Sequence, residues 1–299
     1  MYEINSLIKK NDLKPRSYKK IGKTMIVDSD KGKFVIKEKG EDHHQIFNYL
    51  KSRNFDYYPK ILDEDDKYEL IPFIEEIDIP KEQKILDMID LIALLHSKTT
   101  YYKEIDKEDY KKIYEDIQNN IEYLFSYYND IITIIESKIY MSPSEYLLAR
   151  NISIIFYSLN DCKEKIEKWY ELVKDIKKQR NVVLHNNLEI DHFLEDENNY
   201  LISWNKTKID LPIFDLYKLY KKHNLDFDFE SILKRYETTY PLLEEEKRLL
   251  FILIALPDKI EFDSTEYENC KKISKIIDQI YKTRDLISPY DAKNTKNKP

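Results

Sequence analysis

The stretch that decides the fold covers residues 182–203 and reads VVLHNNLEIDHFLEDENNYLIS. Its apolar runs at 182–184 and 200–204 are rich in β-branched and aromatic residues, as short strands are. Between them, residues 185–194 (HNNLEIDHFL) gather histidines, asparagines and acids. Polar groups of this kind on a loop held between strands are typical of a functional site. We therefore expect this loop to carry one.

The residues before this stretch predict a small sheet-rich lobe. Apolar residues alternate in two runs separated by a turn-forming segment, which is typical of an antiparallel hairpin, and Lys37 ends its second strand. The expected elements are strands at 18–27 and 34–36, a helix at 41–53, and strands at 57–62 and 68–73.

Helical periodicity dominates from Pro80 onward, because apolar residues recur there at three- and four-residue spacings. Helices are expected at 80–96, 108–126, 144–178, 214–222, 229–240, 244–256 and 267–280, with strand character only at 182–184, 193–194 and 200–204. The tail at 291–299 has the composition of a disordered segment. The fold class predicted is α+β, with a small antiparallel-sheet lobe at 1–74, a hinge at 73–78, and a large helical lobe at 75–299.

Composition limits the classes of function. The 299 residues carry a net charge of -7, which argues against an extended nucleic-acid surface, because phosphate binding needs a concentrated basic patch. Cys162 and Cys270 lie far apart without metal-ligand spacing and are expected to be reduced, buried thiols. No signal core is present, and the longest apolar run, 249–256, is too short to span a bilayer. We expect a cytoplasmic protein with neither a membrane nor a nucleic acid as partner.

Glycine is scarce, and this scarcity bears on phosphate binding. The chain has only 3 glycines, Gly22, Gly32 and Gly40, which lie eight or more residues apart. A loop that cradles phosphate needs several residues close together that tolerate positive φ and let the backbone approach the ligand. These three residues cannot form such a loop.

Four segments together resemble the aminoglycoside phosphotransferase and choline kinase superfamily, of protein kinase-like fold, including its spore-coat CotS-like branch. FVIK looks like the strand that ends in the phosphate-binding lysine, which makes Lys37 the candidate nucleotide residue. LIALLHSKT, with His96, resembles the family's LAxLH segment. HNNLEIDHFL matches the family's HGDLHxxNIL, and YLISW followed by PIFDL matches its IDW and P..DL stretch. The resemblance spans residues 17 to about 220.

The resemblance also shows which catalytic groups have changed. Asn186 stands where the family has glycine, and asparagine tolerates the left-handed backbone better than other non-glycine residues. Asn187 takes the place of the catalytic aspartate, and an amide cannot accept a proton from a hydroxyl near neutral pH. His192 and Ser203 take the two metal-ligand positions, although imidazole suits zinc or copper better than Mg²⁺. No acid lies between residues 43 and 55 to orient Lys37, so only Glu41 or Asp42 at the start of the helix would reach it.

The remaining polar residues have simpler roles in this interpretation. His96 and His185 are expected to support the scaffold, His185 by bonding backbone carbonyls. Asp215 is expected to cap a helix that begins near Leu216. The pair His43 and His44 is a poor metal site, because neighbouring residues of a helix point about 100° apart.

The sequence as a whole predicts a kinase-fold protein that has lost phosphoryl transfer and acts as a binding or scaffold protein, with a protein or small molecule as its partner. No metal or cofactor is expected on this interpretation. One alternative is an active small-molecule phosphotransferase that uses ATP and Mg²⁺ with displaced ligands such as Asp191 or Asp210. A structural role in a spore coat follows only from the family analogy.

Overall fold

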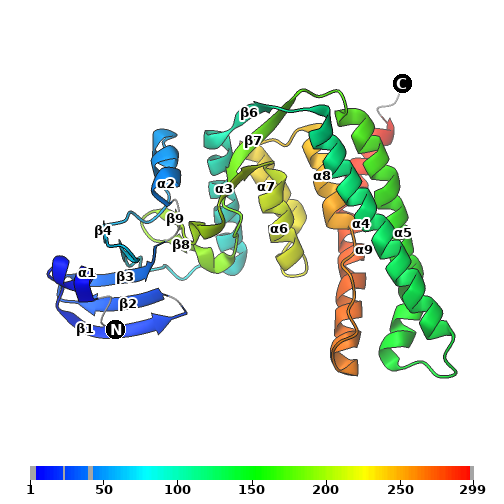
Figure 1. Cartoon of the computed structure of the whole chain (residues 1–299), viewed down its shortest axis with the longest axis horizontal. Helices are drawn as coiled ribbons and strands as arrows, with labels where there is room; N and C mark the ends of the chain where they lie inside the picture. The colour runs from blue at the N-terminus through cyan, green and yellow to red at the C-terminus, as the bar shows by residue number, and fades with distance from the viewer. Residues whose placement is uncertain (1–4, 23, 40–42, 297–299) are drawn as a thin grey trace. The chain divides into compact units, whose positions relative to one another are not determined.

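The computed structural model describes residues 5–22, 24–39 and 43–296. The chain divides by its internal contacts into two compact units, Met1–Thr99 with Val183–Ile209, and Thr100–Val182 with Asp210–Pro299. This division does not coincide with the lobe boundary after residue 74, which stays a prediction. Figure 1 shows the course of the chain, and each unit is described below by itself.

The first unit contains a five-stranded antiparallel sheet in the order β1-β2-β3-β5-β4. Its strands are β1 (Pro15–Ile21), β2 (Thr24–Ser29), β3 (Gly32–Glu38), β4 (Asp63–Glu64) and β5 (Tyr68–Pro72). The single strand expected at 18–27 is wrong: the chain turns at Gly22, whose φ of 58° is open to glycine without steric penalty. The strand expected at 57–62 is also absent, because Pro59 cannot donate to a sheet ladder.

One face of this sheet packs against the short helix α1 (Asn5–Lys10), which sequence periodicity did not predict. Val27, Ile36 and Leu70 from three neighbouring strands form a buried cluster with Leu7 and Ile8 of α1. Side chains alternate between the two faces of a strand, so the residues next to these in sequence point to the opposite face. The sheet therefore has an apolar face covered by α1 and a second face available for polar groups.

Two longer helices and a small hairpin complete the first unit. They are α2 (His43–Ser52), α3 (Lys81–Thr99), β8 (Phe193–Glu195) and β9 (Asn199–Leu201), with 3-10 turns at Ile190–His192 and Trp204–Lys206. Helix α3 buries the expected stripe of Ile85, Met88, Ile89, Ile92 and Leu95. Strand β9 ends at Leu201 rather than at 204, because Ser203 adopts a left-handed conformation that a strand does not accommodate.

The second unit is mostly helical. Its helices are α4 (Lys107–Glu136), α5 (Pro143–Val173), α6 (Ile213–His223), α7 (Phe229–Thr239), α8 (Glu244–Ala255) and α9 (Glu266–Lys296). The strands β6 (Tyr101–Glu104), β7 (Lys178–Leu184) and β10 (Lys208–Asp210) form a sheet in the order β10-β7-β6. Helices α4 and α5 run alongside each other as a long antiparallel hairpin (Figure 1). All six predicted helices are present, whereas β6 and β10 were not predicted.

Three local expectations need correction or refinement. Helix α9 continues to Lys296, so most of the tail expected to be disordered is helical. Cys162 is buried, and burial raises the pKa of its thiol to about 12, whereas Cys270 is only half-buried. Both thiols are free, as expected. Within the described residues, no helix has the length and apolar character needed to cross a membrane.

A buried ion pair joins β7 to the start of α8. Arg180 Nε donates to Glu246 Oε1 at 2.9 Å, its Nη2 bonds the second carboxylate oxygen, and the guanidinium lies 4.4 Å from the Tyr240 ring centroid. The Arg180 and Glu246 side chains are only 9% and 2% exposed. Glu246 also accepts from the backbone N–H of Leu243. The helix expected at 244–256 begins with three acidic residues, and sequence periodicity did not predict the burial of Glu246 among them.

Replacing Arg180 with Met should lower the free energy of unfolding by about 3–5 kcal/mol, because the Glu246 carboxylate would stay buried without its counter-ion. The double variant Arg180→Met with Glu246→Leu should lose much less. Arg248→Met serves as the control, since it breaks the exposed ion pair with Glu244 and should cost less than about 1 kcal/mol. Urea unfolding of the four proteins measures the differences, and equal losses for Arg180→Met and Arg248→Met would contradict this account.

Candidate functional site

The loop at 185–192 has the backbone that its sequence predicts. Asn186 has a φ of 61°, as expected for a residue that takes the place of a glycine. Its side chain holds the turn by donating from Nδ2 to the carbonyl oxygen of Lys206 at 2.6 Å. A short amide side chain tolerates this conformation and supplies a local hydrogen bond, which glycine cannot do.

The structure brings together the three residues predicted at the catalytic and metal positions. Asn187 Nδ2 donates to the carbonyl oxygen of Ser203 at 3.3 Å. His192 Nδ1 lies 2.7 Å from the carbonyl oxygen of Asn187, and the backbone N–H of Ile202 donates to the carbonyl oxygen of His192 at 2.9 Å. The three residues therefore lie next to one another, and the contacts between them run from the Asn187 amide and a ring nitrogen of His192 to backbone oxygens.

His185 contacts the backbone and the tryptophan that adjoin this cluster. Its Nε2 lies 2.8 Å from the carbonyl oxygen of Ile202, and its ring packs edge-on against Trp204 with 4.8 Å between ring centroids. The expectation that it bonds a backbone carbonyl is confirmed. His96 is fully buried in α3, which suits the structural role expected of it.

Lys37 has a carboxylate partner that sequence reasoning missed. It lies on β3 directly opposite Glu69 of β5, and its Nζ is 3.4 Å from Glu69 Oε2. Glu69 is 0% exposed, while the Lys37 side chain is 26% exposed. Because Ile36 and Leu70 point into the cluster under α1, Lys37 and Glu69 lie on the opposite face of the sheet. A neighbouring strand thus supplies the acid that the helix at 43–55 lacks.

The donor atoms at the predicted metal positions do not fit Mg²⁺. This ion prefers octahedral oxygen ligands that include carboxylates, whereas the cluster offers an amide, a hydroxyl and an imidazole. No group of three or more His, Cys, Asp or Glu side chains in the described ranges is arranged to hold a metal ion. Asp191 is exposed, and Asp210 uses its Oδ1 to accept the backbone N–H of Leu211 at 2.8 Å.

Two further acid and histidine assignments can be compared with the structure. Asp215 does not cap its helix: α6 begins at Ile213, so Asp215 lies inside the first turn and is fully buried. The side chain of His43, like residues 41–42, lies outside the described part of the chain. His44 Nε2 is 2.6 Å from Glu64 Oε2, in an exposed ion pair.

A pocket of about 640 Å³ lies in the first unit, where the predicted hinge segment, the α2–β4 connection and the β8–β9 turn meet. Four aromatic side chains line it together with amides and charged groups. The lining includes Tyr57, Tyr58, Tyr200, Phe73, Asp56, Lys60, Asp196 and Asn198. Its volume falls in the range of small-molecule sites, and sequence reasoning did not find it because its lining comes from three separated loops.

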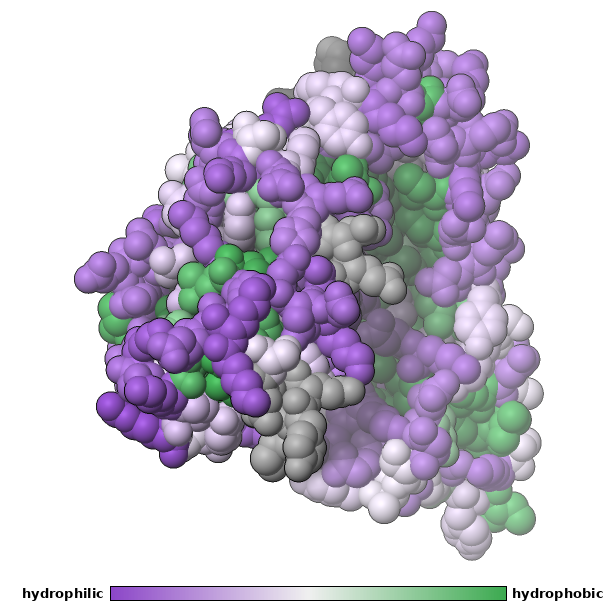
Figure 2. Space-filling view, turned by 60° about the vertical axis from the view of Figure 1, so that its left-hand side comes forward, coloured by the Kyte–Doolittle hydropathy of each residue, from purple (hydrophilic) through white to green (hydrophobic). Residues whose placement is uncertain are grey.

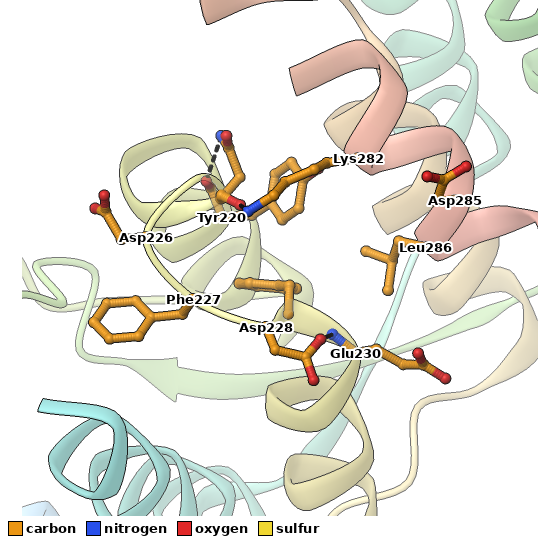
Figure 3. Close-up of a pocket in the computed structure, with 10 residues that line it drawn as sticks. Tyr220, Asp226, Phe227, Asp228, Glu230, Lys282, Asp285 and Leu286 are labelled. Carbon is orange, nitrogen blue, oxygen red and sulfur yellow. Dashed lines mark hydrogen bonds between the residues drawn. The ribbon is translucent and has the colours of Figure 1, made fainter. Parts of the chain in front are cut away.

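A second pocket, of about 420 Å³, lies between α6, α7 and α9 (Figure 3). Its carboxylates do not converge: Asp226 and Asp285 lie at opposite ends of the view. Asp226 pairs with His223 at 3.0 Å, and Asp228 caps α7 by accepting the backbone N–H of Glu230. Asp226 and Asp228 thus stabilise the end of α6 and the start of α7, and we do not regard this pocket as a candidate site.

The fold has close counterparts among solved structures, although the sequence itself matches no family model and no curated protein. An aminoglycoside phosphotransferase from Alicyclobacillus acidocaldarius superposes with a TM-score of 0.70 at 10% identity, covering 93% of this chain and 92% of that one. The chain has the kinase-like fold. A spectinomycin phosphotransferase bound to AMP gives a TM-score of 0.56 at 14% identity, with 94% and 98% covered. A choline kinase from Streptococcus pneumoniae gives 0.50 at 16% identity, with 96% and 97% covered.

The kinase-like fold confirms the predicted fold class, an antiparallel-sheet region followed by a helical one. Identities of 10–16% establish the fold alone. Membership of the CotS-like branch and the roles of Lys37, Asn187, His192 and Ser203 stay predictions.

Asn186 offers a test of the loop backbone. Asn186→Ala should lower the free energy of unfolding by about 1–2 kcal/mol more than Asn186→Gly, because alanine places a Cβ in the left-handed region while both variants lose the bond to Lys206. Chemical denaturation of both variants gives the difference. Equal stabilities would show that the left-handed turn is not maintained in solution.

The Lys37 and Glu69 pair offers a second test. Lys37→Met should destabilise the fold more than Glu69→Gln, because only the first change leaves a buried carboxylate without its cation. The double variant Lys37→Met with Glu69→Leu should recover most of the loss. Thermal unfolding of the three variants at neutral pH provides the comparison, and a reversed order would show that the pair does not form.

Proposed function

We propose that the protein is a kinase-fold binding or scaffold protein that does not transfer phosphoryl groups. The observation that carries the proposal is that Asn187, His192 and Ser203 lie next to one another and provide an amide, an imidazole and a hydroxyl at the positions where the family resemblance places a base and two metal ligands. Phosphoryl transfer depends on positioning and on neutralising charge at the phosphates. A site without these carboxylates supplies neither the base nor the metal.

The partner proposed is a protein or a small molecule. The pocket lined by Tyr57, Tyr58 and Tyr200 supports the small-molecule form, because it combines aromatic faces with a few polar groups. A net charge of -7 does not favour a nucleic acid. We place the protein in the cytoplasm on the basis of its sequence, and a spore-coat role stays an analogy with the family.

The second candidate function is an active small-molecule phosphotransferase that uses ATP and Mg²⁺. It is favoured by one observation, the ion pair of Lys37 with the buried Glu69, which orients a cation on the face of the sheet opposite α1. Asp191 is exposed within the loop at 185–194 and is a candidate displaced ligand, as is Asp210. In the solved structures, the phosphotransferase fold is found with AMP bound, which says nothing directly about this chain.

ATP turnover with a panel of hydroxylated and aminated small molecules separates the two candidates. The wild type and Asn187→Asp should both be inactive, because a restored base cannot act on a phosphate that no metal neutralises. The triple variant Asn187→Asp, His192→Asn and Ser203→Asp should bind Mg²⁺, which isothermal calorimetry detects. Asn187→Ala is the matched control, since it should change neither activity nor metal binding.

Wild-type turnover that persists in Asn187→Ala and disappears in Asp191→Ala or Asp210→Ala would establish the active phosphotransferase instead. Micromolar binding of ATP that EDTA abolishes would have the same meaning, because such coupling requires an intact metal site.

A further inference from the structure

The loop between α4 and α5 exposes apolar side chains to a degree unusual for a folded protein. Ile139 is 90% exposed and Tyr140 is 88% exposed, and Met141 follows them. We call these three residues the hairpin tip. Hydrophilic side chains predominate on the face that Figure 2 shows, with apolar ones gathered in smaller groups. Contiguous exposed apolar groups mark interaction sites more often than single ones do.

The hairpin tip is held rigidly by its flanks. The backbone N–H of Ser137 donates to the carbonyl oxygen of Thr133 at the end of α4. Ser142 and Glu145 form a capping box at the start of α5, and Lys138 spans the loop to bond Glu145. A preorganised loop loses little conformational entropy when it binds. The exposed apolar side chains of the hairpin tip are therefore suited to binding a partner.

The same unit contains an apolar groove whose volume is large enough for side chains of the hairpin tip. The groove has a volume of about 270 Å³ and lies along α5 and α9, with α8 at its floor. We call it the α5–α9 groove. Its apolar lining consists of Tyr157, Ala255, Ile280 and Ile287. This space accommodates one or two large side chains, which suits Ile139 and Tyr140, the two most exposed residues of the hairpin tip.

Charges at the two surfaces are complementary. Lys165 in the α5–α9 groove is already paired with Asp161 and Asp291, each at 2.8 Å. Arg284, also in the groove, is exposed and has no carboxylate partner among the described residues. Glu136, at the end of α4 beside the hairpin tip, likewise has no cationic partner in the part of the chain that the structure describes. One surface thus offers a carboxylate without a cationic partner among the described residues. The other offers the Arg284 guanidinium, which lies 5.2 Å from the Tyr281 ring centroid and has no carboxylate partner there.

We propose that the hairpin tip of one molecule docks in the α5–α9 groove of a second copy of this chain, with Glu136 facing Arg284. The tip and the groove are different surfaces, so the contact is head-to-tail and each bound copy presents a new tip and a new groove. Pro143 beside the tip and Asp161 in the groove lie 18 residues apart on α5, which is roughly 27 Å along its axis at 1.5 Å per residue, so the two surfaces of one molecule are separate.

A lipid surface suits the hairpin tip less well. Membrane binding by short apolar segments is strengthened by basic residues that meet anionic lipid. Lys138, the basic residue just before the hairpin tip, forms an ion pair with Glu145, and Glu136 adds a negative charge without a cationic partner among the described residues. The charge at the tip therefore favours contact with an arginine such as Arg284 over contact with anionic lipid.

Sedimentation velocity over a range of concentrations up to about 1 mM tests the association. The wild type should form species that grow with concentration and do not stop at a dimer. The tip variant Ile139→Ser with Tyr140→Ser, and the groove variant Arg284→Glu, should each weaken association at least about tenfold, as truncation of an interface anchor does. Arg150→Glu is the matched control: it reverses another exposed arginine, on α5 outside the groove, and should change nothing.

Mixing the tip variant with the groove variant gives the sharpest outcome. Each retains one working surface, so the mixture should form a one-to-one complex that grows no further, although neither variant associates alone. Adding Glu136→Arg to Arg284→Glu should restore self-association. Circular dichroism confirms that the variants remain folded.

Three results would overturn the proposal. A wild type that stays monomeric throughout would show that the tip serves a different protein. Association by the groove variant but not the tip variant would indicate a symmetric tip-to-tip dimer. Binding of the wild type to anionic vesicles, lost in the tip variant and without self-association, would assign the tip to a membrane.

Discussion

The loop at the centre of this protein depends on one buried contact, between the ring of His185 and the carbonyl oxygen of Ile202. This contact ties the end of β7 to the residues that follow β9, which are separated from it by 17 positions in sequence. Trp204 packs against the same ring and fixes its orientation. Once these residues are joined, Asn187, His192 and Ser203 have little choice of position, whatever chemistry their side chains carry.

That dependence indicates that the backbone of this loop is held in place without a charged site. The histidine, the left-handed turn and the tryptophan act through backbone hydrogen bonds and packing, which do not require a carboxylate or a metal ion. The residues proposed to have lost their function are those that touch the reacting groups. The scaffold residues and the residues at the catalytic positions are different side chains of the same segment, 185–204, so one set can change while the other remains.

The features that sequence predicted well are those with a local cause. The helices from α3 to α9 follow from periodicity, and the left-handed turn at Asn186 follows from the preference of its own side chain. The features that were missed depend on distant partners. Glu69 lies opposite Lys37 only because β5 pairs with β3 across an intervening helix, and Glu246 is buried only because Arg180 arrives from β7. The pairing register of β3 with β5 and the burial of Glu246 cannot be predicted from the residues next to them in the sequence.

The left-handed conformation of Ser203 has a consequence for how this loop can evolve. With a φ of 67°, the position admits glycine, asparagine, aspartate and serine but excludes branched and bulky residues. Aspartate is thus as acceptable to the backbone as the serine now present, and the same holds for the exchange of asparagine and aspartate at position 187. Each of these two exchanges adds or removes a carboxylate without changing the backbone conformation of the loop. Evolution can therefore make them one substitution at a time while the protein stays folded.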